Sequence, residues 1–273
     1  MMGEQSLLVR GNRAGHGLVL SVTPEQAGWT HIGFDLLRVS AGESWSGATG
    51  DRETALVSIG GVARVTAGAV NWAVGGRPTP FEGLPHCLYL PPGIDYRVDA
   101  ATGLELAICS APAAGGHYPP RLYLPDDVHV HTRGEGQCAR EIHDILMEDR
   151  PAGSLLLTEV YSPAGNWSSY PPHKHDEDRL PDESQLEETY FFRVNPPQGF
   201  ALERVYTGDG GLDQTVAARD GDLVLVPRGY HVVGAPHGYE VYYLNVLAGP
   251  KRALRVSFDP DHAWVKETWE GTW

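Results

Sequence analysis

The stretch GNWSSYPPHKHDEDRLPDESQLEETYFF occupies residues 165–192 and contains the most informative pattern of the chain. Within it, His173 and His175 are two residues apart in a segment that shows no helical period. Side chains at positions i and i+2 of a β-strand point to the same face. On a strand, the two imidazoles would therefore project side by side, and together they can chelate one divalent ion.

A carboxylate and a third imidazole are expected from neighbouring strands. Only one of the adjacent acids Glu187 and Glu188 can face inward, and alternation selects Glu188 because it shares a face with Tyr190. The third imidazole is expected from DGDLVLVPRGYH, in which an apolar strand enters a Pro-x-Gly turn that ends at His231. The sequence thus predicts a metal site formed by His173, His175, Glu188 and His231.

A second His-x-His pair, His129 and His131, competes with this assignment. No suitable carboxylate strand and turn histidine follow it closely in the chain. We therefore interpret these two residues as surface or hydrogen-bonding histidines, which is the common role of imidazoles in proteins.

Short β-branched and aromatic runs recur along the chain, and each ends at Gly, Pro, Asp or Asn, which is typical of an all-β barrel or sandwich. A helical period occurs in REIHDILMEDR (residues 140–150), where Ile142, Ile145 and Leu146 fall on one helical face. We expect this helix to connect two halves. The strand runs are HGLVLSV, TALVSIGGVARVTA, SLLLTEVY, TYFFRV, FALERVYT, DLVLVP and YEVYYLNVLA.

The two halves resemble each other, since YLPPGIDYRV in the first corresponds to LVPRGYHVVG in the second. Asp95 stands where the second half has His231, so the first copy is expected to lack a complete metal site. The predicted division is a degenerate domain over residues 1–125, a connector with a short helix over 126–152, and a metal-binding domain over 153–273.

Composition limits the possible partners and location. The net charge of −14 provides no basic field for nucleic acid or an anionic membrane. Three cysteines without CxxC spacing predict neither a disulfide framework nor a thiolate metal site. With no signal peptide or membrane span expected, we predict a cytoplasmic protein. Paired β domains also predict a homo-oligomer, which light scattering can test.

The metal-site pattern resembles that of the cupins, in which a first motif supplies His-x-His and Glu and a second, built on Pro-x-Gly, supplies the last His. Here the segment DEDRLPDESQLE separates the histidine pair from Glu188, so we expect an insertion at the barrel mouth. The segments RGEGQCAR, GNWSSYPPHKHD, LEETYFFR, QGFALERVYT, GYHVVGAPHGY, YYLNVLAGP and DPDHAW resemble the 5-deoxy-glucuronate isomerase family of myo-inositol catabolism.

The resemblance implies an all-β fold of two cupin (jelly-roll-like) barrels, of which the C-terminal one carries the metal. It also implies an aldose-to-ketose isomerisation of 5-deoxy-glucuronate to 5-dehydro-2-deoxy-gluconate, a reaction that needs no redox cofactor. A divalent metal such as Zn, Mn or Fe would act as a Lewis acid on the enediolate oxygen. Co²⁺ and Ni²⁺ suit the same ligands.

A general base and a cation for the substrate carboxylate are also required. Near the metal along the chain, the candidates for acid–base chemistry are Asp176, Tyr190 and Tyr243, with Asp178 as a further acid. For substrate binding we expect Arg179 or Arg204, because Lys174 and Arg193 have the wrong strand parity. Asn245 shares a strand face with Tyr243 and is expected to line the cavity.

Two other functions fit the same ligands. A cupin oxygenase could use three histidines and one glutamate to hold Fe(II) with open positions for O₂. A noncatalytic sugar-binding cupin could use the metal only to brace the barrel. Oxygen uptake during turnover would indicate the oxygenase, whereas binding without turnover would indicate the binding protein.

Overall fold

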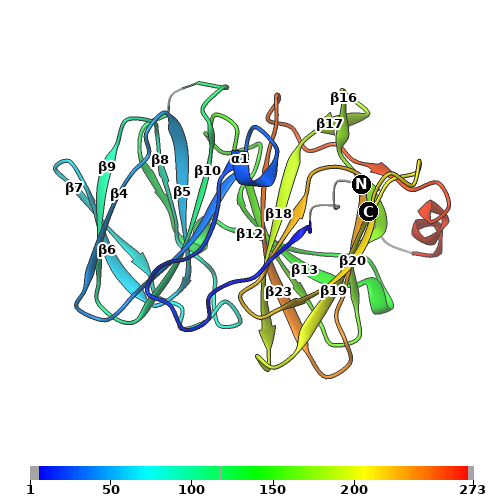
Figure 1. Ribbon diagram of the computed structural model, residues 1–273, viewed down its shortest axis with the longest axis horizontal. Helices are drawn as coiled ribbons and strands as arrows, with labels where there is room; N and C mark the ends of the chain where they lie inside the picture. Colours follow the sequence, from blue (N-terminus) through cyan, green and yellow to red (C-terminus); the bar gives the residue numbers. More distant parts are fainter. Residues whose placement is uncertain (1–5, 117, 270–273) are drawn as a thin grey trace.

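The computed structural model describes residues 6–116 and 118–269, and it consists of two β-barrels side by side (Figure 1). The expected all-β architecture is confirmed. Helices are short and lie in connections: α1 (Pro24–Ala27) and three 3₁₀ turns, Pro125–Asp127, Gly136–Cys138 and Ala263–Thr268. Within the described residues, no helix has both the length and the apolar character needed to cross a membrane.

The first barrel contains two antiparallel sheets. In the larger sheet the order is β11-β8-β5-β10-β3-β2, formed by β2 (Gly17–Val22), β3 (Gly33–Val39), β5 (Arg52–Gly60), β8 (Cys87–Leu90), β10 (Leu104–Pro112) and β11 (Arg121–Tyr123). In the smaller sheet the order is β4-β9-β6-β7, formed by β4 (Ser44–Ala48), β6 (Val62–Ala67), β7 (Val70–Gly75) and β9 (Asp95–Ala100).

The second barrel has a seven-stranded sheet facing a five-stranded one. The first has the order β1-β21-β18-β23-β14-β13-β12, with β1 (Leu8–Val9), β12 (His129–Arg133), β13 (Arg140–Leu146), β14 (Leu156–Ser162), β18 (Glu187–Asn195), β21 (Leu223–Val226) and β23 (Glu240–Ala248). The second has the order β20-β19-β22-β15-β24, with β15 (Trp167–Lys174), β19 (Phe200–Tyr206), β20 (Asp213–Arg219), β22 (Tyr230–Gly234) and β24 (Ser257–Phe258). A separate hairpin comprises β16 (Asp176–Arg179) and β17 (Glu183–Gln185).

Apolar side chains form one core inside each barrel and a third core between the barrels. The larger sheets of the two barrels pack face to face, so their strands are buried on both sides and read as nearly continuous apolar runs. On β18, Tyr190 and Phe192 point into the second barrel, whereas Phe191 points into the interface and stacks on Phe34 with ring centroids 5.5 Å apart. The interface is therefore built like a protein interior.

The predicted domain division needs correction at two places. Residues 8–9 pair with β21 of the second barrel, so the N-terminal segment crosses to the opposite domain. Residues 129–133 and 140–146, assigned to a connector, form the strands β12 and β13 of the second barrel's larger sheet. The outermost predicted limits, residues 1 and 273, lie outside the described residues.

The helix predicted over residues 140–150 was wrong, because residues 140–146 are strand β13. Pairing with β14 shifts register between Asp144 and Leu146, which marks a β-bulge. As a result Ile142 packs inside the barrel, while Ile145 and Leu146 both pack in the inter-barrel core. A bulge interrupts the two-residue alternation of a strand. Here Ile142, Ile145 and Leu146 therefore show the i, i+3, i+4 spacing that is typical of one helical face.

Buried polar groups also join the barrels. The Glu53 carboxylate of β5 accepts hydrogen bonds from the backbone N–H groups of residues 153, 154 and 155 at 2.6–2.7 Å. The Arg77 guanidinium, which follows β7, donates twice to the Glu159 carboxylate of β14, each time at 2.9 Å. Both partners are almost fully buried, and Tyr242 also donates to Glu159. Together these bonds satisfy charges that water cannot reach.

We expect Arg77→Ala to lower the free energy of unfolding by about 3–5 kcal/mol, because the Glu159 carboxylate stays buried after losing its cation. Urea denaturation followed by tryptophan fluorescence measures the change. The matched control is Arg97→Ala, which removes an ion pair with Asp99 at the surface of the first barrel and should change stability little. Equal effects of the two substitutions would contradict an energetic role for the inter-barrel pair.

Candidate metal centre

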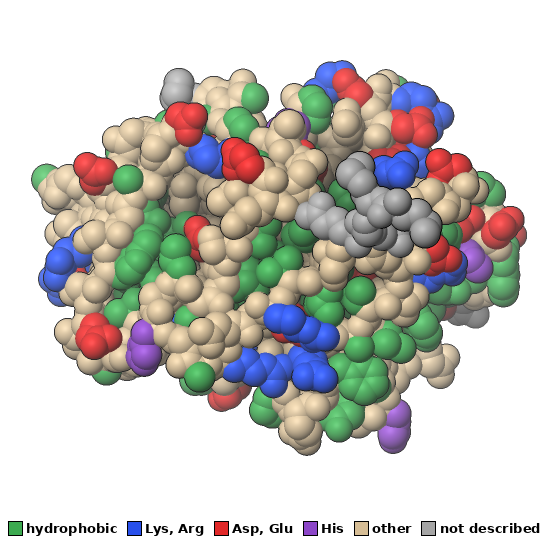
Figure 2. All heavy atoms as spheres, in the orientation of Figure 1, with side chains coloured by type: hydrophobic (Ala, Val, Ile, Leu, Met, Phe, Trp, Pro, Cys, Tyr) green, Lys and Arg blue, Asp and Glu red, His purple; other side chains and the backbone are tan. Residues whose placement is uncertain are grey.

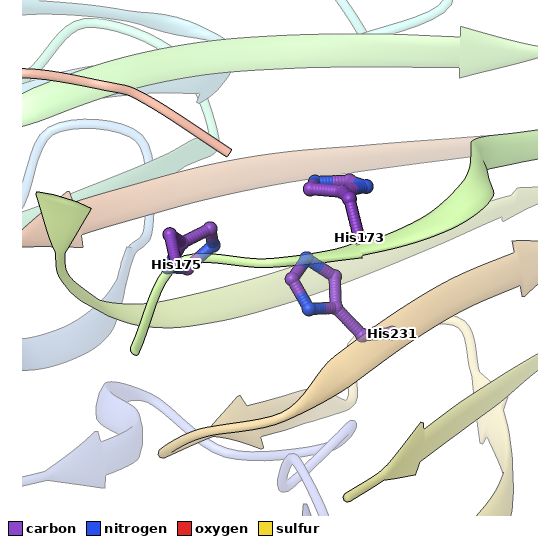
Figure 3. Close-up of side chains that lie close together, drawn as sticks. All are labelled: His173, His175 and His231. Atoms are coloured by element: carbon purple, nitrogen blue, oxygen red, sulfur yellow. The ribbon is translucent and has the colours of Figure 1, made fainter. Parts of the chain in front are cut away.

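Three imidazoles meet inside the second barrel. His173 lies at the end of β15, His175 directly follows that strand, and His231 faces His173 from the paired strand β22. One nitrogen from each ring lies within 4.8 Å of the others. Figure 3 shows the three rings turned toward one another, and the ring centroids of His173 and His231 are 4.5 Å apart.

Glu188 supplies the carboxylate, as strand alternation predicts. It lies on β18 opposite Val226, facing the barrel interior, and is almost fully buried. Its Oε2 atom is 2.9 Å from Nε2 of His175 and 3.2 Å from Nε2 of His231. Its neighbour Glu187 points the other way and accepts hydrogen bonds from the backbone of residues 30–32. All four sequence-predicted ligands are thus brought together.

Backbone carbonyls orient the three imidazoles. Nδ1 of His173 lies 3.3 Å from the carbonyl oxygen of Ser169. Nδ1 of His175 lies 3.0 Å from the carbonyl oxygen of Leu186, and Nδ1 of His231 lies 3.2 Å from that of Gly229. A carbonyl only accepts, so each Nδ1 carries the hydrogen and each Nε2 is directed inward. This is the arrangement in which histidines ligate metals.

The donor set fits a divalent metal. Nε2 of His231 is buried, and its 3.2 Å contact with Glu188 lacks hydrogen-bond geometry, so this nitrogen has no hydrogen-bond partner among the described residues. A buried lone pair aimed at a carboxylate and two other imidazoles is costly unless a cation fills the space between them. Three imidazoles and one carboxylate suit Zn²⁺, Mn²⁺ and Fe²⁺.

The charges of these groups also favour metal binding. Burial and the neighbouring rings of His231 and His175 hold the pKa of His173 well below its usual range, so its imidazole is neutral. Burial opposes ionisation of Glu188, but its imidazole neighbours outweigh burial and lower its pKa to about 2. For His175, the bond to Glu188 outweighs burial and raises the pKa. The carboxylate therefore stays charged, as a ligand must.

The segment DEDRLPDESQLE, which we expect to be an insertion, contains the β16–β17 hairpin. Asp176 pairs with Gln185 at its base, which keeps the chain entering and leaving the hairpin close together and so holds His175 near Glu188. The Asp176 carboxylate accepts a hydrogen bond from the Gly229 N–H at 2.8 Å. Gly229 has φ 90°, and a Cβ there would lie 2.5 Å from a backbone oxygen of residue 206, so the turn before His231 requires glycine.

A cavity of about 110 Å³ opens beside the imidazoles. The hydroxyls of Tyr190 and Tyr243 lie 3.0 Å and 3.3 Å from the Ser169 hydroxyl. Ser169 has φ 50°, which is uncommon for a residue other than glycine and often marks a functional site. Asn245 lines the same cavity, and its buried Nδ2 has no hydrogen-bond partner within the part of the chain that the structure describes.

Both tyrosines are protonated at neutral pH. Burial raises the pKa of Tyr243 to about 12, although the serine hydroxyls partly oppose this. Burial also raises the pKa of Tyr190 well above its usual range, and the Glu188 charge acts in the same direction. Of the three residues predicted for catalysis, these two reach the cavity. Asp176 does not line it and instead contacts Lys174 and the turn at Gly229.

The predicted substrate-binding arginines lie elsewhere. Arg179 is half exposed on β16 and pairs with Glu177 and Glu183. Figure 2 shows this region over β16 and β17, at the upper right, where basic and acidic side chains lie together. Arg204 is exposed on β19 and pairs with Asp213. Strand parity places Arg204 on the outer face, because the neighbouring Glu203 points inward.

The structure instead places Arg133 and Arg140 at the cavity. Arg140 begins β13 and is buried, and burial lowers its pKa to about 10, so it is still a cation at neutral pH. Sequence reasoning missed both residues because it assigned their segment to a connector. One feature of the sequence does point to them: Arg133 and Arg140 are the first and last residues of RGEGQCAR, one of the segments that resemble the family.

Glu203 is a second unanticipated group inside this barrel. It is fully buried on β19, and neither carboxyl oxygen has a hydrogen-bond partner among the described residues. Burial, reinforced by the charge of Glu188, raises its pKa well above the usual range. The side chain is therefore a neutral carboxylic acid. In the sequence, its inward position is indicated only by the alternation of residues along the strand in FALERVYT.

The first barrel has a different interior. Asp95, which corresponds to His231, is exposed at the start of β9. Apolar side chains fill the barrel where the second has its imidazoles, among them Leu56, Val65, Leu88 and Leu106. The metal-type donors described above all come from the second barrel.

The chain is also similar to known proteins. The chain matches the KduI/IolB family over residues 7–265. A 5-deoxy-glucuronate isomerase of Geobacillus thermodenitrificans (strain NG80-2) is 50% identical over 254 residues, which is 92% of each chain. The isomerase of the same name from Geobacillus kaustophilus (strain HTA426) is 48% identical, again over 92% of each chain.

Solved structures show the same fold. The crystal structure of an IolB-like protein from Salmonella typhimurium LT2 matches with a TM-score of 0.93 and 44% identity, covering 96% of this chain and 100% of that one. An oxalate decarboxylase of Lactobacillus farciminis matches with a TM-score of 0.68 and 14% identity, covering 94% and 90%, which shows a common two-barrel fold alone. From its sequence match over nearly its whole length, the chain belongs to the KduI/IolB family.

Proposed function

We propose that this chain is a 5-deoxy-glucuronate isomerase of myo-inositol degradation, which converts 5-deoxy-glucuronate to 5-dehydro-2-deoxy-gluconate. The curated relatives at 50% and 48% identity bear the name of this activity. The observation that carries the proposal is the convergence of three imidazoles and Glu188 beside a cavity lined by Tyr190 and Tyr243. The reaction is internal to the substrate, so no redox cofactor is required.

The residues that would hold one divalent ion are His173, His175, Glu188 and His231. Bound there, Zn²⁺, Mn²⁺ or Fe²⁺ would supply Lewis-acid stabilisation of negative charge on the sugar oxygens. The protein's own contribution is to direct Nε2 of three imidazoles toward one point, through the backbone contacts described above, and to keep the Glu188 carboxylate ionised. Metal analysis by mass spectrometry identifies the ion.

The phenols are suited to move a hydroxyl proton. An aldose-to-ketose conversion transfers one proton between adjacent carbons and a second between the two oxygens they carry. Tyr243 and Tyr190 share the Ser169 hydroxyl, so one phenol can donate its proton to the carbonyl oxygen while the other accepts the proton of the neighbouring hydroxyl, and the serine passes a proton between the two phenols. A high pKa keeps Tyr243 in the donating form.

The substrate carboxylate needs a buried cation. Arg140 supplies one on the cavity wall, and a guanidinium binds a carboxylate through two parallel hydrogen bonds. Arg133 lies on the adjacent strand β12, directly opposite Arg140. Asn245 adds an amide donor on the same wall. This arrangement accounts for an anionic sugar acid as the substrate class.

We also propose that the protein works in the cytoplasm and as a homo-oligomer. All three cysteines are free thiols, which suits a reducing compartment. The outer strand β12 leaves one backbone edge of the larger sheet unpaired within the described residues, and such edges favour association of strands. Cell fractionation and light scattering test the two statements.

We expect His175→Ala to lose its metal and to convert 5-deoxy-glucuronate at least about 10²-fold more slowly, since a Lewis acid is worth several kcal/mol. NMR of the substrate with purified protein measures turnover, and mass spectrometry measures the metal. His237→Ala, an exposed histidine of a turn, is the control and should behave as wild type.

Other outcomes of this experiment point to other functions. Equal turnover by wild type and His175→Ala would contradict a metal-dependent mechanism. Oxygen consumption required for turnover would indicate a cupin oxygenase, and tight binding of the sugar acid without turnover would indicate a noncatalytic cupin.

For Arg140→Ala we expect KM for 5-deoxy-glucuronate to rise about 10–100-fold, because a hydrogen bond to a charged group is worth about 1.5–3 kcal/mol. Steady-state kinetics measures KM and kcat separately. Arg179→Ala and Arg204→Ala are the matched comparisons, since both side chains pair with acids away from the cavity. A rise in KM for either of these, with none for Arg140→Ala, would restore the assignment made from sequence alone.

Removing the Tyr243 hydroxyl should affect kcat. We expect Tyr243→Phe to lower kcat about 10²–10⁴-fold with little change in KM, the range typical for loss of a proton-transfer group. Tyr239→Phe, in the turn before β23, provides the control because its side chain packs against Gly199 and not at the cavity. An unchanged kcat in Tyr243→Phe would exclude this phenol from proton transfer.

A further inference from the structure

The second His-x-His pair lies at the outer edge of the larger sheet of the second barrel. β12 pairs with β13 so that His129 stands opposite Asp144 and His131 stands opposite Ile142. His129, His131 and Asp144 therefore share one face of the two strands. The carboxylate comes from Asp144 on the paired strand β13, fifteen and thirteen residues after the two histidines in the chain.

The spacing of these three side chains suits a shared cation better than hydrogen bonds. Nδ1 of His129 is 3.5 Å from Oδ2 of Asp144, and Nδ1 of His131 is 3.6 Å from the same oxygen. Both separations are too long for good hydrogen bonds. Two donors at about 2.1 Å from one tetrahedral ion lie about 3.4 Å apart, and all three donors here lie within 4.8 Å of one another.

The ring nitrogens of His131 are available to bind a metal ion. Both ring nitrogens are buried, and neither has a hydrogen-bond partner among the residues that the structure describes. His129 stacks on this ring with centroids 5.1 Å apart and is itself mostly exposed, with 71% of its side chain accessible. The group thus consists of a partly buried imidazole, an exposed imidazole and a carboxylate, which an ion can reach from solvent.

We propose that His129, His131 and Asp144 form a second metal site, which binds one borderline transition-metal dication such as Zn²⁺ and leaves its remaining coordination positions open. Two imidazoles and one carboxylate are donors that such ions prefer. This site is separate from the imidazole centre in the barrel, with which it shares no ligand. It connects edge strand β12 to β13 through their side chains.

The site also lies close to the working cavity. Asp144 lines the cavity wall together with Arg133 and Arg140, which occupy the same two strands. A bound dication would neutralise Asp144 on the wall that carries these arginines. Added positive charge there favours an anion in the cavity; this last consequence rests on the proposed function, whereas the metal site itself does not.

The test counts metal ions on the full-length chain. Protein stripped with a chelator is loaded with Zn²⁺, desalted and analysed by mass spectrometry, in wild type, His129→Gln and His131→Gln. We expect each variant to hold one equivalent fewer than wild type. His129→Gln changes an exposed side chain and leaves the core intact, so the test does not depend on whether the fold tolerates substitution of the partly buried His131. His16→Gln, an exposed histidine of the first barrel, should match wild type.

The same comparison in a His175→Ala background separates this site from the barrel centre. Loss of one equivalent on adding His129→Gln to His175→Ala supports the proposal whether or not the barrel centre binds metal. Identical zinc content with and without His129→Gln, in both backgrounds, would overturn it. Isomerase turnover measured in parallel reports on the proposed function alone.

Discussion

A one-residue slip of strand β18 would move the Glu188 carboxylate out of the barrel and into the apolar core between the barrels. The strand cannot slip, because both of its faces are buried and differ in character. Glu188, Tyr190 and Phe192 face the barrel interior, while Phe191 packs on Phe34 of the other domain. The position of the metal-type carboxylate is thus determined by the packing between domains.

The first barrel contributes to the site by providing that surface. Its larger sheet presents apolar side chains to β18 and β23, and its polar residues hold the second barrel in place through Glu53 and the Arg77–Glu159 pair. Its own interior is filled by leucine and valine. A barrel without imidazoles in its apolar interior can therefore still serve the site through packing, since a half-exposed β18 would leave Phe191 in water and its register poorly specified.

Local periodicity was enough to select four side chains that the structure places together, because strand parity and a glycine turn act over a few residues. His173, His175 and Glu188 follow from alternation, and His231 from the turn at Gly229. Groups from distant segments were not visible in this way. The β-bulge in β13 imitated a helix and hid Arg140, and nearness along the chain favoured Arg179, which an ion pair with Glu183 holds at the surface.

The charges inside the second barrel suit an anionic substrate only when taken together. Glu188 is ionised, whereas Glu203 is protonated, so these two buried carboxyl groups together contribute a single negative charge. A divalent cation among the imidazoles and the Arg140 guanidinium would leave a positive excess at the cavity. A sugar acid brings a negative charge that would offset it. In the proposed function, the neutral state of Glu203 thus acts in the same direction as the arginine that would bind the substrate carboxylate.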